Sequence, residues 1–145
     1  MEKVRSGNYV LYPHVEVNCP EARLAEGFAQ IMPMLRAAAE GKRVLTVECY
    51  PGVDQQELLE GLTGLEPVLV IHSDDLAFEP EKLDAALEQD LLPNDPVFGI
   101  MTARRLKDFF YEDKLAEVRR HIQEAPAGLV LVYGVGATLC LLYTS

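Results

Sequence analysis

The residues best suited by type to do chemistry are two adjacent acids, Asp74 and Asp75, in the segment HSDD that follows an apolar run. A carboxylate at such a place can take the proton of a substrate hydroxyl or hold a magnesium ion. Paired acids after a strand also serve as ordinary turn and helix-cap residues. Both are therefore candidate ligand-binding residues, and Asp75 is the candidate base if the protein transfers a group to a hydroxyl.

A second loop stands where nucleotide kinases carry the phosphate-binding pattern GxxxxGK[ST], between an apolar run and a helical pattern. Cys49 and Asp54 replace its two glycines, Gln55 replaces its lysine, and Gly52 alone keeps the loop flexible. The spacing of Asp54 and Glu57 is typical of a capping box, which places carboxylates where a phosphate would dock. A capped helix after a tight turn is the structural alternative to a phosphate site.

Arginines and lysines are concentrated between residues 104 and 120. A lid that clamps a phosphate would use such arginines, whereas the acids interleaved among them favour a solvated face with i,i+4 pairs. The candidate phosphate- or ligand-binding residues are Tyr50, Gly52, Asp74, Asp75, Arg104 and Arg105.

The turn Gly134-Val135-Gly136 carries half of a dinucleotide-binding fingerprint. Leu139 stands where the third glycine belongs, and no acidic ribose partner follows. The alternative is that these glycines let the turn pack closely against the sheet.

Short apolar runs alternate with helical patterns, which indicates a parallel sheet with helices on both faces. The expected fold is a three-layer α/β domain whose sheet is mostly parallel, with ligands bound at the carboxyl ends of the strands. Residues 8–17 are rich in β-branched and aromatic side chains, but a proline restricts them to an edge strand or an extended arm. Strands buried on both faces are predicted over residues 43–49, 67–71 and 128–133.

Helices are predicted over residues 20–40, from residue 54, from residue 80, over residues 103–110 and over residues 112–124. Leu24 opens the apolar stripe of the first helix, and Leu83, Leu87 and Leu91 are expected to point inward from the third. Two prolines predict that residues 92–99 form a loop.

The chain is acidic, with 23 Asp and Glu against 13 Lys and Arg and a formal net charge of −10. Such a surface repels phosphate backbones and anionic lipids, so nucleic-acid and membrane partners are not expected. The three cysteines form neither a disulfide framework nor a zinc pattern, and the histidines have no metal-ligand companions at useful spacing. No signal peptide opens the chain. We therefore expect a cytoplasmic protein without a metal site or cofactor in this chain.

Four segments together resemble the N-terminal region of long bacterial class I mannose-6-phosphate isomerase-like proteins. They are VECYPGVD, IHSDDLAF, DPVFGIMTARRLKDFF and LVLVYGVGA. In those proteins a kinase-like α/β domain precedes a cupin isomerase domain. The order of elements is also similar to the uridine-kinase group of P-loop folds, in which Asp74 and Asp75 would fall at the substrate-side acid.

This resemblance implies an incomplete kinase-like domain over residues 1–139, truncated at its C-terminus. The tail at 140–145 resembles a translated sequencing adapter, so we expect it to be non-native. Zinc is expected only in a downstream cupin domain, covalently linked to this one, and a small phosphorylated metabolite is the expected partner.

Three functions remain open from the sequence. The first is an accessory, non-catalytic P-loop-kinase-like domain with a degenerate phosphate loop, in a protein of carbohydrate metabolism that resembles mannose-6-phosphate isomerase. The second is an active nucleoside or sugar kinase with Asp75 as base and arginines near Arg104 as lid. The third is an interaction domain without a ligand.

Overall fold

The fold is built on a small parallel sheet, seen in a computed structural model that describes residues 18, 24–88, 90–92 and 95–141. The predicted segment at 8–17 and most of the predicted tail at 140–145 lie outside the described residues. The helices and strands are α1 (Phe28–Ala39), β1 (Val44–Glu48), α2 (Gln55–Leu62), η1 (Thr63–Leu65), β2 (Leu69–His72), η2 (Ser73–Leu76), α3 (Pro80–Glu88), β3 (Leu91–Leu92), β4 (Asp95–Gly99), η3 (Leu106–Phe109), α4 (Glu112–Glu124), β5 (Val130–Gly134) and η4 (Ala137–Cys140), where η marks a 3₁₀ helix.

The strand order is β1-β5-β2, and β5 runs parallel to both of its neighbours. Val130 is in register with Val44 on one side and with Leu69 on the other. The connection from β1 through α2 to β2 therefore skips one strand position, which β5 later fills. In the classic dinucleotide-binding order 3-2-1-4-5-6 the first and second strands are adjacent, so this sheet is wound differently.

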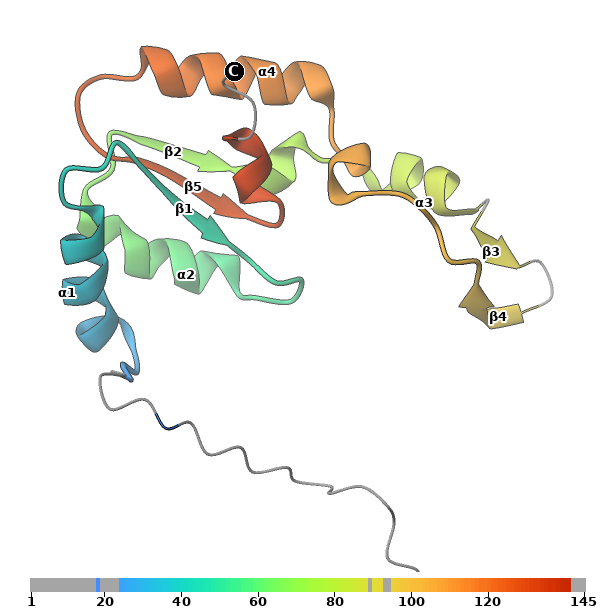
Figure 1. Ribbon diagram of the computed structural model, residues 1–145, viewed down its shortest axis with the longest axis horizontal. Helices are drawn as coiled ribbons and strands as arrows, with labels where there is room; N and C mark the ends of the chain where they lie inside the picture. Colours follow the sequence, from blue (N-terminus) through green and yellow to red (C-terminus); the bar gives the residue numbers. More distant parts are fainter. Residues whose placement is uncertain (1–17, 19–23, 89, 93–94, 142–145) are drawn as a thin grey trace, which may run out of the picture.

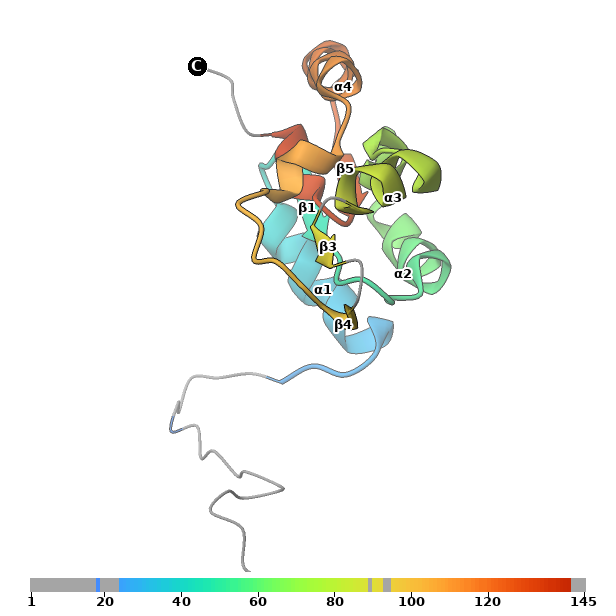
Figure 2. The ribbon, with the colours of Figure 1, turned by 90° about the vertical axis from the view of Figure 1, so that its right-hand side faces the viewer.

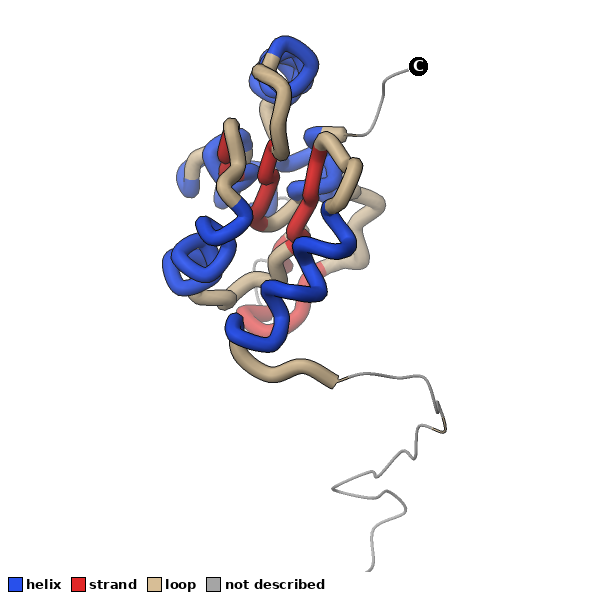
Figure 3. Tube along the Cα trace, turned by 90° about the vertical axis from the view of Figure 1, so that its left-hand side faces the viewer, coloured by secondary structure: helices blue, strands red, loops and turns tan. Residues whose placement is uncertain are grey.

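Helices cover both faces of the sheet, as predicted. Figure 1 shows α4 along one face and α1 and α2 along the other, and the view in Figure 2 confirms that the strands lie between them. Val130 and Val132 pack in one core cluster with Leu115 and Ile122 of α4. Leu131, also fully buried, alternates to the opposite face of the strand. The three layers are also visible when the Cα trace is viewed from the other side (Figure 3).

Of the three strands of this sheet, the central strand alone is buried along its whole length. The prediction that all three strands are buried on both faces is wrong for β1 and β2, which are mostly half-exposed. Val70 of β2, for example, remains 41% exposed. The physical reason is that a three-stranded sheet has two edge strands, and apolar runs do not reveal which strand is central.

Arg43, immediately before β1, holds the C-terminal end of α4. Its guanidinium donates to the carbonyls of Ala125 at 2.5 Å and Pro126 at 3.1 Å. The last carbonyls of a helix have no partners within the helix and carry the negative end of its dipole. An arginine at this position satisfies them and joins the start of the sheet to α4.

The segment from α3 to β4 extends away from the sheet (Figure 1). It leaves and returns through short antiparallel pairing in which Ala77 is bridged to Phe110. Residues 92–99 are not simply a loop, because β3 and β4 form a two-stranded antiparallel ribbon. We call residues 79–108 the arm.

The leucines predicted to point inward from the third helix do not form a buried stripe. Helix α3 ends at Glu88, and Leu91 lies in β3 with 60% of its surface exposed. Leu83 is half-buried and Leu87 is 38% exposed. Four-residue spacing predicts a helix face but not the surface that covers it, and the arm lies away from the sheet.

The first helix is shorter than predicted. It begins at Phe28, after Gly27 with a φ of +73°, and the preceding described residues from Leu24 are not helical. Leu24 is 97% exposed and so is not part of an apolar stripe. A glycine in the left-handed region interrupts the helical pattern that the leucine spacing suggested.

No helix in the described part of the chain is long and apolar enough to cross a membrane.

Gly134 ends the central strand with a φ of +120°, in space that only a glycine fits. A Cβ atom there would lie 2.4 Å from the Ser73 hydroxyl and 2.7 Å from the Asp74 carboxylate. The interpretation of the glycine turn as a close-packing device is therefore confirmed at this position.

We expect Gly134→Ala to lower the free energy of unfolding by about 3 kcal/mol, because it combines backbone strain with a steric clash. The matched control is Gly52→Ala, which has a similar φ of +98° but open space around the new methyl group. The control should cost only about 1 kcal/mol from backbone strain. Urea unfolding followed by circular dichroism measures both, and equal losses would contradict the packing argument.

Candidate functional site

Asp74, at the carboxyl end of β2, is held by two neighbours. Its Oδ1 accepts the backbone N–H of Val135 at 2.7 Å, and its Oδ2 accepts the Gln55 side-chain amide at 2.8 Å. The Gln55 carbonyl in turn hydrogen-bonds the imidazole of His72. The structure thus brings the three loops at the strand ends together through Asp74, as expected for a parallel sheet, but both oxygens of this acid bind the protein itself.

Glu48, the last residue of β1, is a central polar residue that the sequence analysis missed. Its carboxylate accepts the backbone N–H of Gly136 and, at 3.0 Å each, the backbone N–H and hydroxyl of Thr138. These donors lie at the start of η4, where a bound anion would otherwise be favoured. The only sequence signal was an acid at the end of an apolar run.

The backbone donors of the glycine turn are already bound to carboxylates of this chain. The turn leads into the four-residue 3₁₀ helix η4, whose first N–H groups already bind Glu48. Gly136 is required because its φ is +74° and a Cβ there would lie 2.7 Å from the Phe110 ring. Both glycines of the turn serve close packing.

Ser73 and Tyr133 form the buried part of this edge. The Ser73 hydroxyl is fully buried, 3.1 Å from the Tyr133 carbonyl and 2.9 Å from that of Val135. The Tyr133 ring stacks on His72 with 4.8 Å between ring centroids. Burial raises the pKa of the Tyr133 phenol, and the charges of Asp75 and Asp74 raise it further. The phenol is thus packed against His72 and stays protonated near neutral pH.

The loop after β1 is closed at the start of α2 by Asp54. Its Oδ1 accepts the backbone N–H groups of Gln56 at 3.1 Å and Glu57 at 3.0 Å. This confirms the predicted N-cap. Of the two candidates in this loop, Tyr50 is 81% exposed and Gly52 adopts a positive φ with nothing nearby.

Asp75 is the freest of the candidate acids. Its side chain is 77% exposed, and one oxygen lies 3.4 Å from Nδ1 of His72. An accessible carboxylate of this kind can contact a ligand. Asp74 beside it differs, because both of its oxygens accept hydrogen bonds from the protein.

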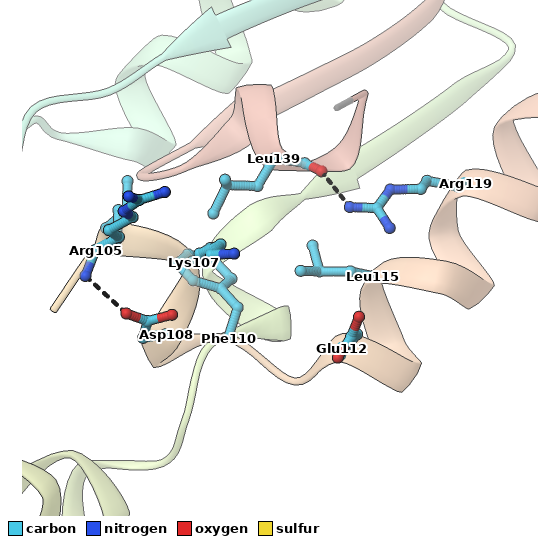
Figure 4. A pocket seen from close by; sticks show the side chains of 9 residues that line it. Arg105, Lys107, Asp108, Phe110, Glu112, Leu115, Arg119 and Leu139 are labelled. Atoms are coloured by element: carbon cyan, nitrogen blue, oxygen red, sulfur yellow. Dashed lines mark hydrogen bonds between the residues drawn. The ribbon is translucent and has the colours of Figure 1, made fainter. Parts of the chain in front are cut away.

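Arg104 and Arg105 do not lie at the strand ends with the acids. Arg104 forms an ion pair with Asp90 across the arm, with 2.9 Å between Nε and Oδ2. Arg105 lines a cavity of about 500 Å³ between η3, α4 and η4 (Figure 4). Of the residues of η4, which follows the glycine turn, only Leu139 lines this cavity. The predicted cluster of acids and arginines is thus divided between two places.

The two cysteines that the structure describes are core residues. Cys49 is 6% exposed and Cys140 1% exposed, and burial raises the pKa of the Cys140 thiol. Among the described residues, no three His, Cys, Asp or Glu side chains gather into a metal-binding group.

The fold and site define an α/β domain with a parallel sheet whose strand-end loops are closed by internal carboxylates. A family described as a domain of unknown function, DUF8485, matches residues 27–144, and the chain belongs to that family. No curated protein and no solved structure matches the chain.

We expect Asp74→Asn to lower the free energy of unfolding by about 1–2 kcal/mol. The asparagine amide is uncharged and has only one acceptor oxygen, so it cannot accept both of the hydrogen bonds that Asp74 accepts. The matched control is Asp75→Asn, one residue further on and mostly exposed, which should change stability by less than about 0.5 kcal/mol. Thermal and urea unfolding measure both variants. A larger loss for Asp75→Asn would show that the structural role lies with the other acid.

Proposed function

We propose that the chain is a non-catalytic accessory domain with a P-loop-kinase-like organisation. Its support is the parallel sheet with helices on both faces, together with a phosphate loop that lacks both the glycines and the lysine of the active pattern. The domain serves a larger protein that acts on phosphorylated sugars, as the resemblance to mannose-6-phosphate isomerase-like proteins suggests.

The observation that carries this proposal is the position of Asp54. Its carboxylate binds two backbone N–H groups at the start of α2, the place where a kinase loop presents such groups to a nucleotide phosphate. A phosphate arriving there would meet a fixed negative charge and no cation, because Gln55 replaces the lysine and donates to Asp74 instead. Like charges repel, and no lysine offsets the repulsion in this exposed loop, so a triphosphate should bind poorly there.

Titration with Mg-ATP tests the non-catalytic assignment. We expect no saturable binding up to about 1 mM in isothermal calorimetry and no release of phosphate, because the loop has a carboxylate in place of its cation. Asp75→Asn and the exposed control Asp113→Asn should both behave like the wild type. Micromolar binding of Mg-ATP that only Asp75→Asn abolishes would instead establish an active kinase with Asp75 as its base.

The link to a larger enzyme has its own test. We expect the gene, read beyond the codon for Leu139, to encode a cupin domain with the zinc ligands of the isomerase. Zinc and isomerase activity belong to that domain in this proposal. A gene without a cupin would remove the isomerase context and leave the outcome of the nucleotide titration unaffected.

A further inference from the structure

We propose that the cavity between η3, α4 and η4 binds a small phosphorylated polyol, with its phosphate on Arg105, Lys107 and Arg119. This inference rests on the proposed function only for the class of ligand. The site itself lies apart from the phosphate-loop position, since none of the residues that line it comes from residues 50–55 or 72–75.

The cavity gathers cations in a protein that is otherwise acidic. Arg105 and Lys107 approach it from η3 and the residue before it, and Arg119 approaches from α4 on the other side (Figure 4). Within the described part of the chain, the ion pairs of basic residues with acids involve other residues, so these three charges are not neutralised by a direct partner. Three separated donors suit the several oxygens of a phosphate group.

Arg119 is held in place for such a contact. Its Nη2 donates to the Leu139 carbonyl at 2.8 Å, which fixes the plane of the guanidinium. Its Nε is buried and has no hydrogen-bond partner. Because Nε is buried, a ligand in the cavity would contact the guanidinium through its outer nitrogens. The guanidinium is therefore oriented by the protein before any ligand arrives.

The other residues that line the cavity are apolar or acidic, and they suit a ligand that has a carbon skeleton and hydroxyl groups as well as a phosphate. Phe110 and Leu115 are buried beneath the cavity, and Leu139 contributes a further apolar surface. Asp108 and Glu112 add carboxylates, and Asp108 uses one oxygen to bind the Arg105 backbone N–H at 2.8 Å. Carboxylates accept hydrogen bonds from hydroxyl groups, and apolar side chains pack against the carbon face of a polyol.

The same two acids set an upper limit on ligand charge. Three cations against two carboxylates leave a net charge of about +1 around the cavity, which suits one phosphate but repels a triphosphate. A volume of about 500 Å³ is within the range of small-molecule sites and fits a phosphorylated sugar of five or six carbons.

Glucose 6-phosphate is the probe for a binding test by isothermal calorimetry and by ¹⁵N-resolved NMR of the full chain. We expect saturable binding with a dissociation constant of about 1 mM or lower, and shifts centred on residues 105–110, 119 and 139. Glucose and inorganic phosphate, which each carry half of the recognised groups, should bind at least about tenfold more weakly.

Arg105→Ala and Lys107→Ala are the informative variants, because both side chains are exposed enough for truncation to leave the fold intact. Each should weaken glucose 6-phosphate binding about tenfold by removing a charge-assisted hydrogen bond. The matched control is Arg120→Ala, which removes the same charge from α4 at a residue paired with Glu117 outside this cavity, and should leave binding unchanged.

The proposal is overturned by no binding at a glucose 6-phosphate concentration about 10-fold above the expected dissociation constant, by an equal loss in Arg120→Ala, or by NMR shifts centred on residues 50–55. Inorganic phosphate binding as tightly as glucose 6-phosphate would also overturn it, by showing a simple anion site. Only shifts on residues 50–55 would also bear on the phosphate-loop position; the other results leave the Mg-ATP titration unaffected, so failure here is distinguishable from failure of the non-catalytic assignment.

Discussion

The structure depends on two carboxylates that join the carboxyl ends of the three parallel strands. Glu48 from β1 and Asp74 from β2 both accept backbone N–H groups of the turn that leaves β5. A turn out of a buried central strand exposes donors that need partners, and an ionised acceptor forms stronger hydrogen bonds with them than a neutral one. With β5 between its neighbours, one acid on each side fastens the turn to both edges of the sheet.

This arrangement has a direct chemical consequence. In α/β sheets that bind ligands, the carboxyl end of the strands offers unpaired N–H groups and free side chains. Here Glu48, Asp54 and Asp74 occupy those N–H groups, and Gln55 is bound to Asp74. The usual ligand position is thereby filled by the chain's own anions. Three cations without a direct acidic partner among the described residues, Arg105, Lys107 and Arg119, line the cavity beside η4 instead.

Much of the central fold could be predicted because it depends on local signals. Three apolar runs gave the parallel strands, and the residue types at Asp54 gave the N-cap of α2. The periodicity over 112–124 predicted α4, and Leu115 and Ile122 are indeed buried. Which strand is central could not be predicted, because that depends on the path of the connections rather than on any one run.

The arm and the site were harder for the same reason. Leu87 and Leu91 have helical spacing but no core beneath them, and Gly27 delays the start of the first helix, against the apolar pattern that begins at Leu24. The role of Glu48 depends on the turn after β5, 88 residues further along the chain, so no local motif marks it. Arg104 and Arg105 are adjacent in sequence, yet one pairs with Asp90 and the other lines the cavity.

The position of the cavity depends on where the arm rejoins the core. Arg105 and Lys107 stand at the end of the arm, just before the chain rejoins the core through the bridge between Phe110 and Ala77. The Phe110 ring also packs against Gly136, whose backbone N–H is held by Glu48. One wall of the cavity is therefore set by the return of the arm, and the other by η4, whose position depends on the strand-end carboxylates. Glu48, which binds the backbone N–H groups of the turn after β5, thus also helps to position the surface to which we assign a phosphate.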